Sequence, residues 1–312
     1  MNLKKIICLA VALLLFQTLF GIYSDAGTRS FTFLKVPIGP RAAGMSNAYF
    51  GLSNDELAPF WNPAGLAQIK CKKYGVTYLN YIDSYNGGAA SCVLPISNIS
   101  AVAFFAKFVG AGDFDKTEID ESGGIIDLGT FGSYDVMLGV SYGKVISDII
   151  DIGFSFKFIT ESIDDYSSQA IAGDVAIMHQ TPNPKLKIGL GVKNFGKQIS
   201  QFDSKEEKLP LLLAGGIRYD IPDGHLALDI NKPADNDVYG NLGVEKKVRD
   251  NLTLRAGYRT NASDFNVGSS IDFLSGISAG FGFKWKNYMF NYAINSWGEL
   301  GFINQLSVGR NF

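Results

Sequence analysis

The sequence has few of the side chains that metal sites and covalent catalysis need. Its 312 residues include two histidines, His179 and His225, and three cysteines, none of them at metal-ligand spacing. No Gly-x-Gly-x-x-Gly or Walker-type loop occurs. Residues 276–280 read Gly-Ile-Ser-Ala-Gly, like the nucleophile turn of serine hydrolases, but they run into an alternating strand and no histidine follows. We therefore predict no enzyme, no cofactor and no metal.

An excess of charge of either sign is also missing. The formal net charge is −2 and the isoelectric point is about 5.8. Such a chain has no long-range attraction for nucleic acid or for an anionic membrane surface, so we predict no nucleic-acid partner. The acidic stretch 113–121 falls in a long predicted loop, where a solvated surface is favoured over a cation site.

Long apolar runs are absent after residue 26, which excludes a helical membrane protein. Before it, Lys4 and Lys5 precede an uncharged run over 6–22, and Ser24-Asp25-Ala26 places small residues where a cleavage site needs them. This pattern predicts a secretory signal peptide at 1–26. The alternative is one membrane-anchoring helix, since a run of about 17 residues reaches the low end of spanning length.

Only two cysteines, Cys71 and Cys92, remain in the predicted mature chain. A hairpin of 72–82 with 87–95 would place Cys92 opposite Tyr78, roughly 23 Å along the strand from Cys71. A disulfide needs Cα atoms within about 7 Å, so we predict two free thiols.

What fills the chain instead is strict alternation of apolar and polar residues. In Ile277–Lys286 one face is Ile, Ala, Phe, Phe and Trp, and the other is Ser, Gly, Gly, Lys and Lys. The same period appears in Tyr288–Ile294 and Ile152–Phe158. A soluble sandwich also alternates. Here, however, the polar face is mainly Gly, Ser and Asn and the apolar face is rich in Phe and Tyr, which is typical of a lipid-facing wall around a polar lumen.

The alternation predicts an all-β transmembrane antiparallel barrel of about 14 strands in residues 71–312. We expect strands at 72–82, 87–95, 98–109, 133–145, 149–162, 167–179, 185–197, 208–220, 223–232, 236–248, 251–261, 275–286, 287–297 and 301–312. Connections after even-numbered strands are all short, and the long segments 110–132, 198–207 and 262–274 each follow an odd-numbered strand. A barrel with both ends at the periplasmic face requires this asymmetry.

Residues 27–70 are not strand-like, so we expect them to form a hatch or plug of the barrel. They contain the segment FLKVPIGPRAAGMSNAYFGLSNDELAPFWNPAGLA, residues 33–67. This segment resembles the amino-terminal signature of PorV/PorQ-type outer-membrane proteins, relatives of the fatty-acid channel FadL. The terminal Phe312 resembles the assembly signal of bacterial outer-membrane barrels, although Arg310 stands where that signal is usually apolar.

The resemblance implies a 14-stranded barrel with this segment folded inward. The residues expected in the hatch are Arg41, Gly44, Met45, Asp55, Phe60, Trp61, Asn62, Pro63, Gly65 and Leu66. Pro63 suits the first position of a helix and Asn62 its cap. Arg41, Asp55 and Glu56 are expected to pair with lumen charges, for which the candidates are Lys157, Lys193 and Arg255. For each residue a structural role in the plug is favoured over ligand contact.

Two functions remain open at this stage. The first is passage of hydrophobic, fatty-acid-like molecules across the outer membrane of a Gram-negative-type bacterium, with membrane lipid and the hydrophobic ligand as partners. The second is a non-transporting component of a type IX-like secretion system that binds cargo or translocon proteins.

Overall fold

The computed structural model describes residues 25–82, 85–202, 206–265, 268–269 and 271–312. The predicted signal peptide, 1–26, therefore lies almost wholly outside the described residues. No helix in the described ranges is long and apolar enough to cross a membrane.

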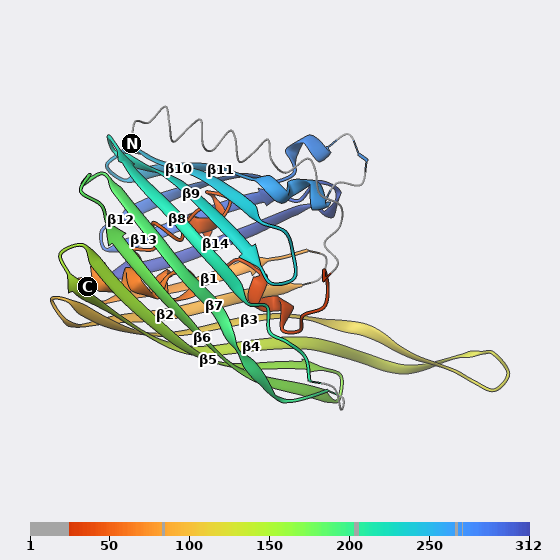
Figure 1. The fold of residues 1–312 in the computed structure, drawn as a ribbon. Helices are drawn as coiled ribbons and strands as arrows, with labels where there is room; N and C mark the ends of the chain where they lie inside the picture. The colour runs from red at the N-terminus through yellow and green to blue at the C-terminus, as the bar shows by residue number, and fades with distance from the viewer. Residues whose placement is uncertain (1–24, 83–84, 203–205, 266–267, 270) are drawn as a thin grey trace.

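In the described part of the chain, fourteen antiparallel strands form one closed barrel in sequence order, with β1 paired to β14 (Figure 1). This confirms the predicted fold class. The strands are β1 Lys73–Asn80, β2 Asn86–Ser97, β3 Ser100–Ile119, β4 Ile125–Ser147, β5 Ile150–Ile163, β6 Tyr166–Gln180, β7 Leu186–Ser200, β8 Leu212–Ile221, β9 Gly224–Pro233, β10 Tyr239–Arg249, β11 Leu252–Arg259, β12 Ile277–Trp285, β13 Tyr288–Ser296 and β14 Phe302–Asn311.

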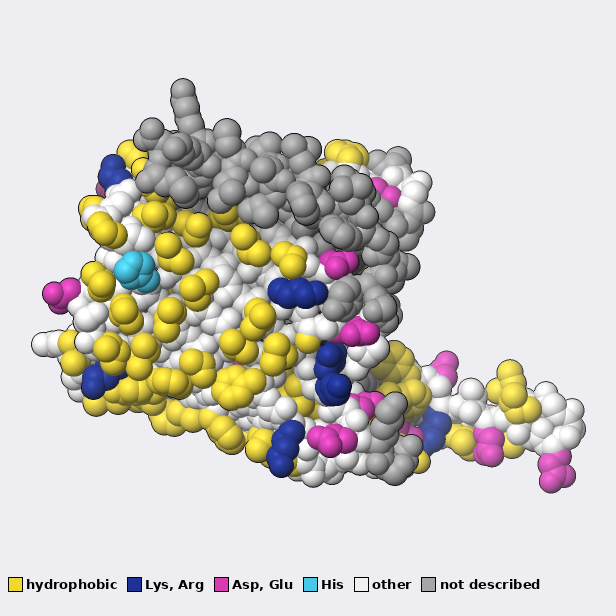
Figure 2. Space-filling view, in the orientation of Figure 1, with side chains coloured by type: hydrophobic (Ala, Val, Ile, Leu, Met, Phe, Trp, Pro, Cys, Tyr) yellow, Lys and Arg dark blue, Asp and Glu magenta, His cyan; other side chains and the backbone are white. Residues whose placement is uncertain are grey.

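The alternation of side chains follows the predicted pattern. Along β5, Phe154, Phe156 and Phe158 are 47%, 54% and 37% exposed. Between them, Ser155 and Lys157 are 7% and 3% exposed and face inward. Figure 2 shows apolar side chains spread over the outer wall on the face in view. Successive side chains of a strand point to opposite faces, so one sequence period builds both the apolar exterior and the polar lumen.

Two details differ from the prediction. Most of 110–132, expected as a loop, is strand: β3 and β4 continue as a two-stranded hairpin that projects beyond the barrel and is broken only at 120–124 (Figure 1). Local backbone pairing across a short turn extended the ladder there. In the first hairpin Cys92 lies opposite Tyr74 rather than Tyr78, because Asn80 pairs with Asn86 and the register is shifted by four residues. Both thiols are free, as predicted.

The residues before β1 fold into short helices that lie against the inner wall (Figure 1). These helices are η2 Thr32–Lys35, α2 Pro40–Ala43, α3 Ala58–Trp61 and η3 Pro63–Gln68. Three more single-turn helices lie between the late strands: η4 Thr260–Phe265, η5 Asp272–Leu274 and η6 Gly298–Leu300. We call residues 31–69 the plug.

Candidate functional site

The plug packs on inward-facing glycines of the wall. A Cβ atom built on Gly153 of β5 would lie 2.1 Å from the backbone nitrogen of Ala64. One built on Gly257 of β11 would lie 2.2 Å from the carbonyl carbon of Met45. Wall and plug backbones thus touch on opposite sides of the barrel, and any side chain at these positions would displace the plug.

Arg41 joins the plug to the wall through charge. Its Nε and Nη2 atoms each donate to Glu245 of β10 at 2.8 Å, and its Nη1 donates to Asp55 at 3.1 Å. Arg255 of β11 donates to the same Glu245 at 2.7 Å. A carboxylate held between two guanidinium groups is the strong, planar form of ion pair.

These contacts correct the predicted pairing. Asp55 pairs within the plug, with Arg41, and Arg255 is joined to the plug only through Glu245. Sequence reasoning missed Glu245, which sits next to two lysines in a stretch that reads as solvated surface. Burial would raise the pKa of Asp55, but Arg41 and a hydrogen bond from Tyr49 hold that pKa below its ordinary value.

Glu56, next in the chain, has no such partner. Its side chain packs where Gly75 of β1 and Gly309 of β14 leave room: a Cβ on either glycine would lie 2.5 Å from Glu56 side-chain atoms. Burial, with the neighbouring Asp55 charge, raises the pKa of Glu56 to about 7. The carboxyl group is thus close to half-protonated at neutral pH.

The Asn62-Pro63-Ala64-Gly65 turn is an internal brace of the plug. Asn62 accepts a hydrogen bond from Ala64 N and donates one to Phe50 O, both 3.0 Å. A Cβ on Gly65 would lie 1.7 Å from Ser53 O, so only glycine fits. Leu66 and Met45 are fully buried, and Gly44 contacts the wall at Gly280.

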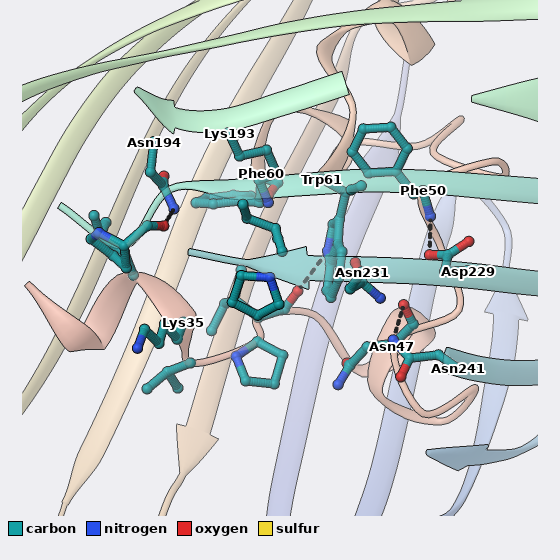
Figure 3. Close-up of a pocket in the computed structure, with 18 of the residues that line it drawn as sticks. Lys35, Asn47, Phe50, Phe60, Trp61, Lys193, Asn194, Asp229, Asn231 and Asn241 are labelled. Atoms are coloured by element: carbon teal, nitrogen blue, oxygen red, sulfur yellow. Dashed lines mark hydrogen bonds between the residues drawn. The ribbon is translucent and has the colours of Figure 1, made fainter. Parts of the chain in front are cut away.

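Above this brace lies an inner cavity of about 170 Å³ (Figure 3). Its apolar lining includes Phe60 and Trp61 of the plug, Phe105 of β3 and Met137 of β4. Phe60 and Phe105 meet edge to face, with ring centroids 5.0 Å apart. This gives the cavity an aromatic wall.

More cationic than anionic side chains line the inner cavity. Lys157 is neutralised by Asp174 at 2.7 Å. Lys193 instead donates to the Phe60 carbonyl at 2.6 Å, with its Nζ 5.4 Å from the centroid of the Trp61 ring. Lys107 donates to the Phe33 and Val36 carbonyls at 2.6 and 2.5 Å. Among the described residues, Lys107 and Lys193 have no carboxylate within ion-pair distance.

Sequence reasoning named Lys157 and Lys193 but missed Lys107. The signal was present: Lys107 occupies the inward-facing set of β3, between Phe105 and Val109, where every other member is apolar. It also missed Asp229 of β9, whose carboxylate accepts hydrogen bonds from Tyr49 N and Phe50 N, each at 2.7 Å (Figure 3).

A second cavity of about 600 Å³ lies at the loop end of the barrel. We call it the loop-side vestibule. Its lining includes Tyr81, Phe202, Asn236 and Trp297 from the connections, and Asp135 and Glu161 from β4 and β5. The described residues hold no group of three or more histidine, cysteine or acidic side chains placed to bind a metal.

No protein-family model and no curated protein sequence matches this chain. Solved structures do. The CymD monoaromatic hydrocarbon channel matches with a TM-score of 0.63 and 13% identity, over 89% of this chain and 98% of that one. The Ralstonia pickettii toluene transporter TbuX matches with a TM-score of 0.59 and 12% identity, over 88% and 98%.

A Pseudomonas aeruginosa FadL homologue matches with a TM-score of 0.55 and 12% identity, over 88% of this chain and 98% of that one. At these identities the likeness concerns the fold. The chain therefore shares its overall fold with these three solved channels.

Proposed function

We propose that this protein is an outer-membrane channel that binds hydrophobic small molecules with an anionic headgroup and passes them across the membrane. The observation that carries this proposal is the inner cavity, where an aromatic wall faces two lysines that have no carboxylate partner among the described residues. Similarity of fold to channels for hydrophobic molecules supports it.

Size limits what the inner cavity takes. An engineered protein cavity of about 150 Å³ holds benzene. A space of about 170 Å³ therefore fits one ring or a short length of alkyl chain. A fatty-acid-like ligand would extend from the inner cavity into the loop-side vestibule, with its carboxylate at a lysine.

The localisation follows from the same proposal. We place the protein in the outer membrane of a Gram-negative-type bacterium, exported by a cleavable signal peptide at 1–26 and surrounded by lipid. The finer relation to PorV/PorQ-type proteins rests on the signature in residues 33–67 alone. The plug's position in the lumen is compatible with it.

Binding of radiolabelled dodecanoate to the protein in nanodiscs tests the ligand class. Lys193→Met should weaken dodecanoate binding about tenfold, which corresponds to one charge-assisted hydrogen bond. Dodecanol binding should not change. Lys185→Met, at an exposed turn, is the matched control. Equal dodecanoate binding by the Lys193 variant and the original protein would refute the proposed headgroup site.

A further inference from the structure

One short segment of the plug separates the two cavities. Residues 35–37 line both the inner cavity and the loop-side vestibule. We call residues 33–37 the strap, which begins at the buried Phe33, 2% exposed. Asn236, Arg259 and Asn261 also line both cavities, so the strap is the part of this shared boundary that the plug contributes.

Three side chains of the wall and its connections hold the strap. Asp235 pairs with Lys35 at its solvent-facing side. Gln305 of β14 donates to the Pro37 carbonyl at 3.2 Å. Lys107 binds two strap carbonyls at once, Phe33 O and Val36 O, and is 4% exposed.

Lys107 is well placed to hold the strap, but its hydrogen-bond acceptors there are uncharged. A buried ammonium group needs compensation. Here it comes from two neutral carbonyl oxygens and from the Phe33 ring, whose centroid is 5.6 Å from Nζ. A carboxylate is a better partner, because hydrogen bonds between two ionised groups are shorter and stronger than those to neutral acceptors. An anionic headgroup that reaches Lys107 would therefore compete successfully with the strap carbonyls.

We propose that Lys107 is a latch that keeps the strap closed, and that the anionic headgroup of a ligand opens it by taking over the lysine's hydrogen bonds. Phe33 O and Val36 O then lose their donor, while the polar contacts of the strap with Asp235 and Gln305 and its apolar packing remain. This rests on the proposed function for the identity of the ligand. It goes beyond that function in naming the gate and the trigger.

Labelling of a buried cysteine reports the strap directly. Ile38, at the end of the strap, is 3% exposed. Ile38→Cys, in protein whose other cysteines are replaced by alanine, is reacted with a membrane-impermeant maleimide in nanodiscs. Dodecanoate should raise the labelling rate at least fivefold, whereas dodecanol should leave it within twofold. Equal rates with the two compounds would overturn the proposal without any change at Lys107.

The latch itself is tested by substitution in the same background. Lys107→Met should raise the rate without ligand about tenfold and abolish the response to dodecanoate, and Lys107→Arg should restore slow labelling. Lys185→Met is the control, because Lys185 lies at an exposed turn and lines neither cavity. Rates for Lys107→Met within twofold of the parent would contradict the latch.

This readout is separate from transport. Dodecanoate-dependent labelling in a protein that takes up no dodecanoate into liposomes would leave the latch standing and refute the channel. Uptake with labelling indifferent to dodecanoate would refute the latch and leave the channel. Heat-modifiable migration on gels shows whether each variant has formed its barrel.

Discussion

At the scale of single residues, the charges in the lumen divide into those paired with an opposite charge and those that donate to backbone carbonyls of the plug. Arg41, Glu245 and Arg255 satisfy one another and fix the plug to β10 and β11. Lys107 is buried and Lys193 is partly buried, and each donates to plug carbonyls. Each ammonium group also lies near an aromatic ring of the plug, Phe33 or Trp61. The sequence alone does not separate these groups, because Arg41 and Glu245 are 204 residues apart and Lys107 and Phe33 are 74 residues apart.

Substitution of Arg41 by methionine should strongly destabilise the protein. It leaves Asp55 buried without its partner and Glu245 with one guanidinium instead of two, and removal of one member of a buried ion pair costs about 3 to 5 kcal/mol. The midpoint of urea unfolding measures this. Lys247→Met breaks the exposed pair with Asp250, which water screens, and should leave the urea midpoint almost unchanged. Equal losses for the two variants would show that Arg41 does not anchor the plug.

Glu56 should make stability depend on pH. Its pKa rises from 4.5 to about 7 on folding, so the folded state binds more protons between these values. The contribution of Glu56 to the free energy of unfolding is therefore fully present below about pH 4.5 and is lost as the pH rises to about 7. The total loss is up to about 3 kcal/mol.

The Glu56→Gln variant should lose that pH dependence. It keeps the size of the side chain and removes the titration, so the variant should be more stable than the parent at pH 8 and similar at pH 4.5. Unfolding midpoints at the two pH values decide, and a stability gain that is the same at both would point to packing instead of ionisation.

At the scale of elements, the presence and order of the strands were predictable from the sequence, but the residues at which some of them end were not. Alternation predicted where all fourteen strands lie, and the bounds of all but β3 and β4 to within a few residues, because lipid and lumen demand opposite side chains at every step. The β3–β4 hairpin leaves the lipid at its far end, so the apolar pattern stops while backbone pairing continues to Ile119 and Ile125. The register of the first hairpin differs by four residues from the predicted one, because the alternating pattern does not show at which residues the chain turns.

The sequence predicted that small residues would allow the plug to pack closely in the lumen. It did not predict which wall residue contacts which plug residue. The wall glycines that the plug contacts, such as Gly153, lie within strands. The sequence does not indicate which plug atoms each of these glycines contacts.

Gly153→Ala should push the plug from the wall while the barrel still forms. The added methyl group would lie 2.1 Å from Ala64 N, a backbone atom that has no room to rotate away. Ion conductance of single proteins in planar bilayers should rise several-fold, with heat-modifiable migration retained. Gly240→Ala is the control, because its Cβ meets nothing nearer than 3.6 Å. Matching conductance in the two variants would mean that the plug does not seal the lumen.

At the scale of the whole molecule, a closed barrel with an apolar exterior surrounds a lumen that the plug fills from one end and two cavities occupy toward the other. Water-filled pores admit small polar solutes of any chemistry, whereas here the backbone of the plug touches the wall at Gly153 and at Gly257. Selective passage therefore requires a ligand that binds the inner cavity and moves the strap. A hydrophobic tail and an anionic head satisfy both sides of that cavity.

Liposomes containing the purified protein provide the most direct measurement: initial rates of entry of radiolabelled dodecanoate and arabinose over a range of concentrations, each corrected for protein-free liposomes. Entry of dodecanoate through the protein should saturate with concentration, and arabinose should enter no faster than in protein-free liposomes. Rapid entry of arabinose, or dodecanoate entry no faster than in protein-free liposomes, would contradict a plugged channel for hydrophobic anions.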